Sequence, residues 1–175
     1  MTAYPPAIEG CLEACRRCRI LVDAVNDQEE STSRDAYRAI GPHLRHCLDH
    51  FTCFLRGFDA GTVDYDARDR DERQERDPQH FIRELDTIVE RLRAIESGAT
   101  RRSLEVCQEV TPDGRSRTVP SNAERELMFL SSHTIHHIAI MSLLAKAAGM
   151  TVPDDLGVAF STASYMNRAA IRSGA

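Results

Sequence analysis

The stretch 121–149, SNAERELMFLSSHTIHHIAIMSLLAKAAG, is the longest largely apolar segment of the chain, and the predicted fold depends on it. It opens with S-x-x-E, the spacing of a capping box at a helix start. It closes on Gly149, a residue type suited to the position just after a helix. Apolar residues cover nearly every side of a helix drawn over 123–148. A helix of that kind packs against several neighbours or against a second subunit.

Three more helices are predicted before this one. Apolar residues at helical spacing indicate helices over 8–26 and 78–97. Another is expected from the Gly41-Pro42 pair to Gly61, because proline is comfortable only in the first turn of a helix. DQEESTS before it is expected to be a loop, and the charge-rich residues 64–77 after it are expected to be a solvated connection or an exposed helix.

These elements predict an all-α protein, a four-helix bundle with one long crossover. A small β-hairpin is expected between the third and fourth long helices, because SLEVCQEV and RSRTV flank a Thr-Pro-Asp-Gly turn. The length of 175 residues fits one domain, so residues 1–175 are predicted to form a single helical domain.

Composition narrows the classes of function. A formal net charge of −5 argues against a nucleic-acid partner, which would require a basic face. No apolar run approaches the roughly 20 residues that a membrane span needs, and MTAYPPAIEG lacks the pattern of a secretory signal. We therefore expect a cytoplasmic protein with no membrane partner. The excess apolar surface of the last helix predicts a homodimer.

Three cysteines, Cys11, Cys15 and Cys18, have the spacing C-x3-C-x2-C, which is also that of the radical-SAM iron–sulfur loop. That loop follows a strand in a much larger α/β barrel, whereas these cysteines fall at i, i+4 and i+7 of a helical pattern. They are therefore predicted to be reduced, buried in the core and not metal ligands.

Six of the seven histidines lie in two predicted helices: His43, His46 and His50 in one, and His133, His136 and His137 in the other. His133 and His137 are one turn apart on the same face, roughly 6 Å along the axis, so their imidazoles can converge on one ion. A third imidazole from a neighbouring helix would leave a coordination position open for water or substrate. A metal-free bundle with hydrogen-bonded histidines is the alternative interpretation.

The segments IGPHLRHCLDHF and RELMFLSSHTIHHIA resemble the two histidine segments of the DinB/YfiT-like superfamily of metal-binding four-helix bundles. TVDYDARDRD and LGVAFST resemble a subgroup of it, and the similarity extends from about Ala39 to Tyr165. The resemblance implies three metal ligands: His46, which precedes Asp49 by three residues, and the pair His133 and His137. His136 matches a non-ligand position.

Several further residues stay open as contributors to the site. His50 is favoured as an accessory ligand, and His43 or Cys53 could also join. Asp49 could orient a ligand, and Glu126, two turns before His133, is a candidate general base whose alternative role is a salt-bridged helix residue. Cys47 beside His46 is expected to pack in the core, because adjacent helix residues point about 100° apart. The catalytic residues are therefore unassigned.

The resemblance implies a metal-dependent enzyme, either a hydrolase or a thiol-dependent transferase, in which the ion activates water or a thiol. A non-enzymatic protein with a structural or sensing metal site is the alternative, and a fourth protein ligand would favour it. Imidazole ligands suit several divalent metals, of which zinc and nickel are expected. No other cofactor is predicted, and the small-molecule substrate is not defined by the sequence.

Overall fold

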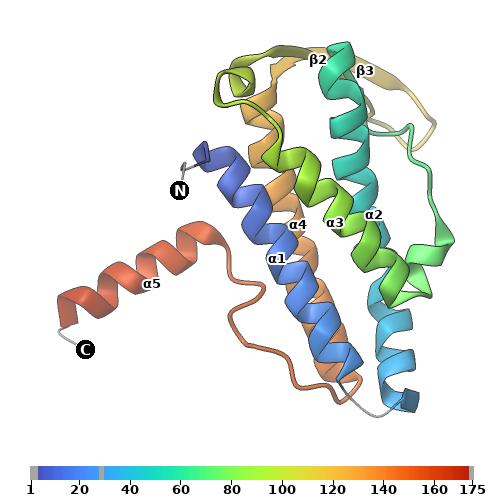
Figure 1. The fold of residues 1–175 in the computed structure, drawn as a ribbon, viewed down its shortest axis with the longest axis vertical. Coiled ribbons are helices and arrows are strands. Elements are labelled where there is room, and N and C mark those ends of the chain that lie inside the picture. The colour runs from blue at the N-terminus through green and yellow to red at the C-terminus, as the bar shows by residue number, and fades with distance from the viewer. Residues whose placement is uncertain (1–3, 28–29, 174–175) are drawn as a thin grey trace.

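The structure, a computed structural model, describes residues 4–27 and 30–173, and most of them are helical (Figure 1). Four long helices lie against one another: α1 (Pro6–Asn26), α2 (Glu30–Ala60), α3 (Pro78–Arg93) and α4 (Ala123–Ala147). Both α1 and α2 pack against α3 and α4. Their inward faces form one continuous apolar core.

The prediction of an all-α four-helix bundle is wrong, because the described residues also form a mixed sheet and a fifth α-helix. The sheet has the order β1-β2-β3, where β1 pairs parallel to β2 and β2 pairs antiparallel to β3. The remaining elements are β1 (Thr62–Asp64), η1 (Glu72–Glu75), η2 (Ser97–Arg101), β2 (Ser103–Glu109), β3 (Ser116–Asn122) and α5 (Phe160–Ser173). Both η1 and η2 are short 3₁₀ helices.

Strand β1 is the element that turns a hairpin into a mixed sheet. Val63 pairs with Val106 in parallel register, and both side chains are buried against the core. Three residues are too few for a pattern of alternating burial to reveal a strand, and the partner strand lies some forty residues later in the chain. The strands Ser103–Glu109 and Ser116–Asn122 lie where the sequence placed the hairpin.

Helix α2 starts at Glu30, eleven residues before the predicted start, and Pro42 lies inside it. Tertiary contacts outweigh the cost of the internal proline. Tyr37 and Ile40 are buried in the core, and the Tyr37 hydroxyl donates a hydrogen bond to the Gln74 carbonyl at 2.7 Å. Gly41 also allows the chain at Glu75 to approach, because a Cβ at Gly41 would lie 2.5 Å from the Glu75 carbonyl oxygen.

The sequence predicted the C-terminal end of α4 correctly but not the residue that caps its N-terminal end. The predicted capping box is wrong: Asn122 is the N-cap, and its side chain accepts a hydrogen bond from the Arg125 N–H. The Ser121 hydroxyl instead donates to Glu126 at 2.5 Å. At the other end Gly149 has φ +83°, as expected for a glycine after a helix.

The apolar character of α4 has a further consequence. By length and composition alone, α4 could cross a membrane, and the expectation that no segment meets this criterion is wrong. The core helix of a soluble protein meets the same criterion. Here α4 packs against α1 and α2, so its composition is weak evidence for a membrane span.

The three cysteines of α1 lie in the core, as predicted. Cys11, Cys15 and Cys18 are each at most 2% exposed and form no disulfide. Burial raises the pKa of all three thiols, that of Cys15 to about 12, so they are protonated at neutral pH. Their exclusion from metal binding remains a prediction.

Candidate metal centre

Four histidine rings, three partly buried and that of His50 buried, lie close together between α2 and α4. The Nε2 atoms of His46 and His133 are 3.0 Å apart. The ring of His50 has its centroid 4.3 Å from that of His46 and 4.7 Å from that of His133. The ring of His137 lies 4.7 Å from that of His46 and 4.6 Å from that of His133.

Three of these residues could hold a metal ion. One ring nitrogen from each of His46, His50 and His133 lies within 4.8 Å of the other two. Two nitrogens bound to one tetrahedral ion at roughly 2.0–2.1 Å would be about 3.3 Å apart, close to the His46–His133 separation. The donor set of three imidazoles fits a borderline-soft divalent ion such as zinc or nickel.

The predicted ligands are thus brought together in part. His46 and His133 belong to the three-histidine group, and His50, favoured only as an accessory, completes it. His137 is adjacent but outside the group, and its Nδ1 lies 2.9 Å from Nδ1 of His43. That hydrogen bond leaves Nε2 of His137 unassigned, and its role as a ligand stays a prediction.

The environment keeps these imidazoles neutral. Burial, followed by repulsion from the neighbouring histidines, lowers the pKa of His46 to about 3 and the pKa values of His133 and His137 to about 4. Burial also lowers the pKa of His50. Metal binding requires neutral imidazole, so protons compete little for these nitrogens at neutral pH.

Arg68, which the sequence analysis did not single out, lies beside this group. Its Nη1 is 3.4 Å from Nδ1 of His46, and its Nε is buried without a hydrogen-bond partner. A guanidinium can only donate, so Nδ1 of His46 is the acceptor in this long contact, and an ion bound at Nε2 would require the proton to leave that atom. No spacing rule marks Arg68, because the contact depends on the path of the chain after β1.

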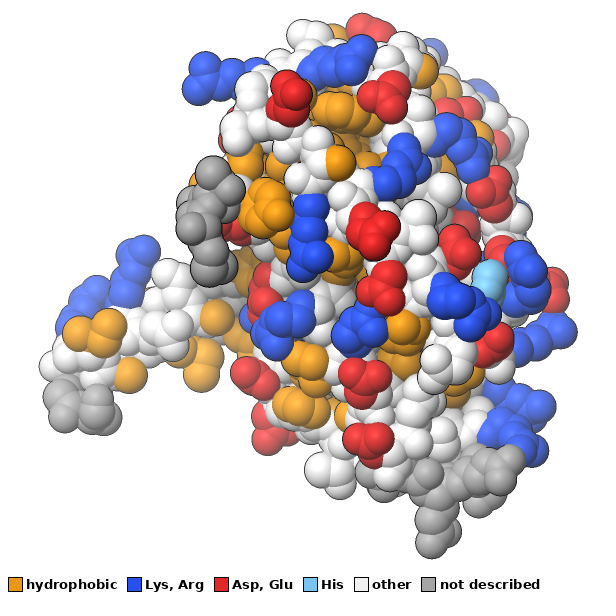
Figure 2. Space-filling model, viewed as in Figure 1, with side chains coloured by type: hydrophobic (Ala, Val, Ile, Leu, Met, Phe, Trp, Pro, Cys, Tyr) orange, Lys and Arg blue, Asp and Glu red, His pale blue; other side chains and the backbone are white. Residues whose placement is uncertain are grey.

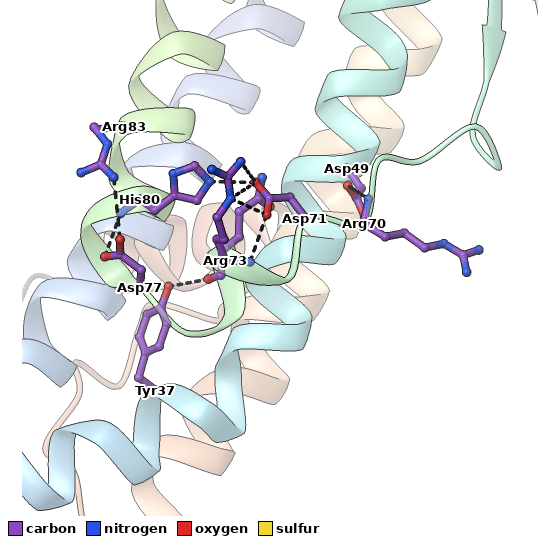
Figure 3. A network of polar contacts seen from close by, with 9 residues as sticks. Tyr37, Asp49, Arg70, Asp71, Arg73, Asp77, His80 and Arg83 are labelled. Carbon is purple, nitrogen blue, oxygen red and sulfur yellow. Dashed lines mark hydrogen bonds and ion pairs between the residues drawn. The ribbon is translucent and has the colours of Figure 1, made fainter.

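Asp49 holds this segment in place rather than orienting His46. Its carboxylate accepts a hydrogen bond from the Arg70 N–H at 3.4 Å, where Arg70 has a left-handed φ of +52° (Figure 3). Further along the same segment, Asp71 lies 2.9 Å from Nε2 of His80 and pairs with Arg73. Residues 65–77 are therefore anchored to α2 and α3, although most of their side chains are not buried and a short 3₁₀ helix lies among them.

Glu126 is fully buried and has three hydrogen-bond donors. The Tyr65 hydroxyl donates at 2.8 Å, the Ser121 hydroxyl at 2.5 Å and Nη1 of Arg125 at 2.9 Å. Glu126 is thus a buried helix residue with an ion pair to Arg125, and its role as a general base stays a prediction. Tyr65 connects it to the metal centre, since its ring stacks on His50 at 5.5 Å and 24°.

The two cysteines of α2 near the histidines are also accounted for. Cys47 is buried and its pKa is raised to about 12 by burial, so it is not an activated nucleophile. Cys53 is buried as well, and its thiol donates to the Ala67 carbonyl at 3.6 Å. Neither belongs to the metal-capable group found among the described residues.

A pocket of about 430 Å³ on the surface of α4 reaches one of the metal-capable histidines, His133. His133 forms part of its wall, and the other lining residues are Arg125, Met128, Phe129, Ser132 and His136. Phe129 stacks on His133 with ring centroids 5.3 Å apart, and the Arg125 guanidinium lies over Phe129 at 5.5 Å. A small molecule in this pocket would meet both an apolar wall and a cation next to the candidate metal centre.

Comparison with protein-family models, with curated proteins and with solved structures finds no match to this chain.

Proposed function

We propose that this chain binds one divalent metal ion, zinc or nickel, and is a metal-dependent hydrolase or thiol-dependent transferase. The observation that carries the proposal is the convergence of His46, His50 and His133, with two Nε2 atoms 3.0 Å apart. The resemblance of the histidine segments to the DinB/YfiT-like superfamily supports the same function. A divalent ion held by neutral imidazoles would lower the pKa of a bound water or thiol and so generate a nucleophile at neutral pH.

The surrounding residues support an enzyme in three ways. The His50 ring is fixed by its hydrogen bond to the backbone and by stacking on Tyr65. Phe129 and Met128 supply an apolar surface beside His133. Arg125 reaches the same pocket and offers a positive charge to an anionic group.

A second candidate is a structural or sensing metal site without catalysis. The position of His137 favours it, because its ring is within 4.7 Å of two members of the three-histidine group. If His137 supplies a fourth nitrogen, the ion is closed to water and substrate. Closed four-ligand sites are typical of structural zinc.

Elemental analysis and X-ray absorption of the untagged protein test both candidates. Protein purified without added metal or chelator should contain about one divalent ion per chain. An open site should show three imidazole nitrogens plus water, and an added small thiol should introduce a sulfur scatterer at about 2.3 Å. Four imidazole nitrogens with no change on adding thiol would support the structural or sensing site instead.

Two variants serve as references for that measurement. The double substitution His46→Ala and His133→Ala should abolish metal uptake, whereas His136→Ala should retain it. Less than a tenth of an ion per chain, with no uptake on titration, would contradict both functions.

A further inference from the structure

We propose that two copies of this chain form a symmetric dimer in which α5 of each copy lies in the groove between α1 and α4 of the other. Helix α5 projects away from the helical body (Figure 1). Apolar side chains are exposed along the projecting helix in Figure 2. The exposed fractions are 74% for Tyr165, 57% for Met166 and 79% for Ile171.

A helix in this position requires a partner. It has only 14 residues, and isolated helices shorter than about 12–15 residues are marginal in water. Phe160, Ala163, Met166 and Ile171 fall within roughly 140° of one another around the helix axis at 3.6 residues per turn. They form an apolar stripe, and only Phe160, at its start, packs against the core of its own copy.

The groove that would receive this stripe has a volume of about 570 Å³. Its walls come from the start of α1, the outer face of α4 and the start of α5, and they include Ala7, Met128, Ile135 and Ala139. Met128 is 61% exposed although it lies among apolar neighbours. An apolar groove of this kind suits the apolar face of a helix.

The α5 helix of the same copy does not fill this groove. Its first residue, Phe160, already forms part of the groove wall. The chain just before α5 is fixed, because Nη1 of Arg17 donates to the carbonyls of Leu156 and Val158, both at 2.9 Å. A Cβ at Gly157 would lie 2.5 Å from Cα of Ala139, so this segment is in close contact with α4. The segment that leads into α5 is therefore held against the body.

Charge favours a second copy as the occupant over other partners. Between residues 160 and 173 the chain has two arginines, Arg168 and Arg172, and no acidic residue. Glu124 lines the groove. A helix whose only charged residues are arginines thus meets a carboxylate at the groove of a protein whose net charge is −5.

The proposed dimer would also bring α5 of the second copy to the candidate metal centre. The groove shares Met128, Ser132 and His136 with the pocket that His133 lines. A helix lying in the groove would border that pocket and restrict its opening. The dimer itself does not depend on the metal, so the two proposals can fail separately.

Light scattering with size-exclusion chromatography tests the proposed dimer on the full-length protein. The wild type should have twice the 19.6 kDa mass of one chain at micromolar concentration. The double variant Met166→Glu and Ile171→Glu should be monomeric, because it places two charges in an apolar groove. Its metal content and helical circular dichroism should be unchanged, since neither side chain contributes to the core. Val110→Glu, at a 58% exposed residue after β2, is the matched control and should remain dimeric.

Charge reversal provides a second measurement. Glu124→Arg should raise the dimer dissociation constant several-fold, and adding Arg168→Glu and Arg172→Glu should restore it. A wild type with the mass of one chain, or a Met166→Glu and Ile171→Glu variant that stays dimeric, would overturn the proposal. Binding of wild-type monomers to vesicles of anionic phospholipid would also overturn it, and would identify α5 as a membrane-surface helix.

Discussion

Nδ1 of His50 lies 2.8 Å from the backbone oxygen of His46, one turn earlier in α2. A carbonyl oxygen only accepts hydrogen bonds, so Nδ1 of His50 carries the hydrogen and Nε2 carries the lone pair. This is the tautomer that a metal ligand needs, and hydrogen bonds of this kind orient metal-binding histidines in proteins. His50 is thus prepared to bind a metal ion before any ion arrives.

The first prediction compares two histidines near the site. We expect His50→Ala to weaken divalent metal binding at least tenfold, because it removes a preoriented ligand. His136→Ala should change the affinity less than threefold, since His136 lines the outer pocket. Competition against a chromophoric chelator measures both affinities.

His137→Ala completes this comparison. We expect it to weaken binding more than His136→Ala, because the ring of His137 lies within 4.7 Å of those of His46 and His133. Equal losses for the two variants would show that the metal-facing side of α4 has been assigned incorrectly.

The second prediction concerns the cation beside the ligands. We expect Arg68→Met to strengthen divalent metal binding at least three- to tenfold, as removal of one nearby like charge is worth roughly 1 kcal/mol even with the screening of bulk water. The substitution also frees Nδ1 of His46 from a donor, so that Nε2 can carry the lone pair. Isothermal titration with zinc measures the change.

Arg56→Met is the matched control for that experiment. Arg56 contacts the same segment of the chain, through the Asp69 carboxylate at 2.6 Å and the Ala67 carbonyl at 3.3 Å, and its contacts are with exposed groups. It should leave the affinity unchanged. Weaker binding by Arg68→Met would mean that Arg68 positions His46 for the ion rather than opposing it.

The sequence predicted two members of the three-histidine group as ligands, His46 and His133, but it gave the third, His50, only as an accessory. Helical spacing brought His133 and His137 to one face of α4, and resemblance selected His46. Whether His50 or His137 comes closest to that pair depends on rotamers and on the packing of α2 against α4, which spacing alone does not determine. Arg68 was beyond prediction, because it reaches His46 from an irregular segment.

In the fold, too, elements set by local sequence patterns were predicted, and elements that depend on contacts with distant residues were missed. Long amphipathic helices are visible in the sequence, and α1 and α4 were placed within two residues of their observed ends. The start of α2 was missed because contacts of Tyr37 and Ile40 with distant residues overrule the local cost of Pro42. Strand β1 exists only through its pairing with β2.

The third prediction concerns pH and the metal-free protein. The pKa of His46 in the folded state is about 3, and those of His133 and His137 are about 4, against 6.5 for an ordinary histidine. Below pH 6.5 the unfolded chain takes up protons that the folded chain does not, so stability falls as the pH falls from 6.5 towards 4. We expect the urea midpoint to drop by about 1 M between pH 7 and pH 5.

Equilibrium urea unfolding of chelator-treated protein measures this effect, and the chosen pH range lies above the titration of ordinary carboxylates. The double variant His46→Gln and His133→Gln is the control, and its midpoint should depend less on pH. An equal pH dependence in the variant and the wild type would show that other groups cause the loss of stability.

The fourth prediction concerns Glu126, whose carboxylate has no exposed surface and is hydrogen-bonded by Tyr65 at 2.8 Å. Tyr65→Phe removes this donor without changing the shape of the ring, so the buried carboxylate loses one of its partners. We expect the free energy of unfolding to fall by about 1–3 kcal/mol, the cost of an unsatisfied buried group. Tyr165→Phe is the matched control: Tyr165 is 74% exposed on α5, and its substitution should cost nothing measurable. The metal content of Tyr65→Phe should stay at the wild-type value, because its ring can still stack on His50. Equal stability of the two variants would show that Ser121 and Arg125 suffice to hold Glu126, and loss of metal by Tyr65→Phe would instead show that the Tyr65–Glu126 pair positions the ligands.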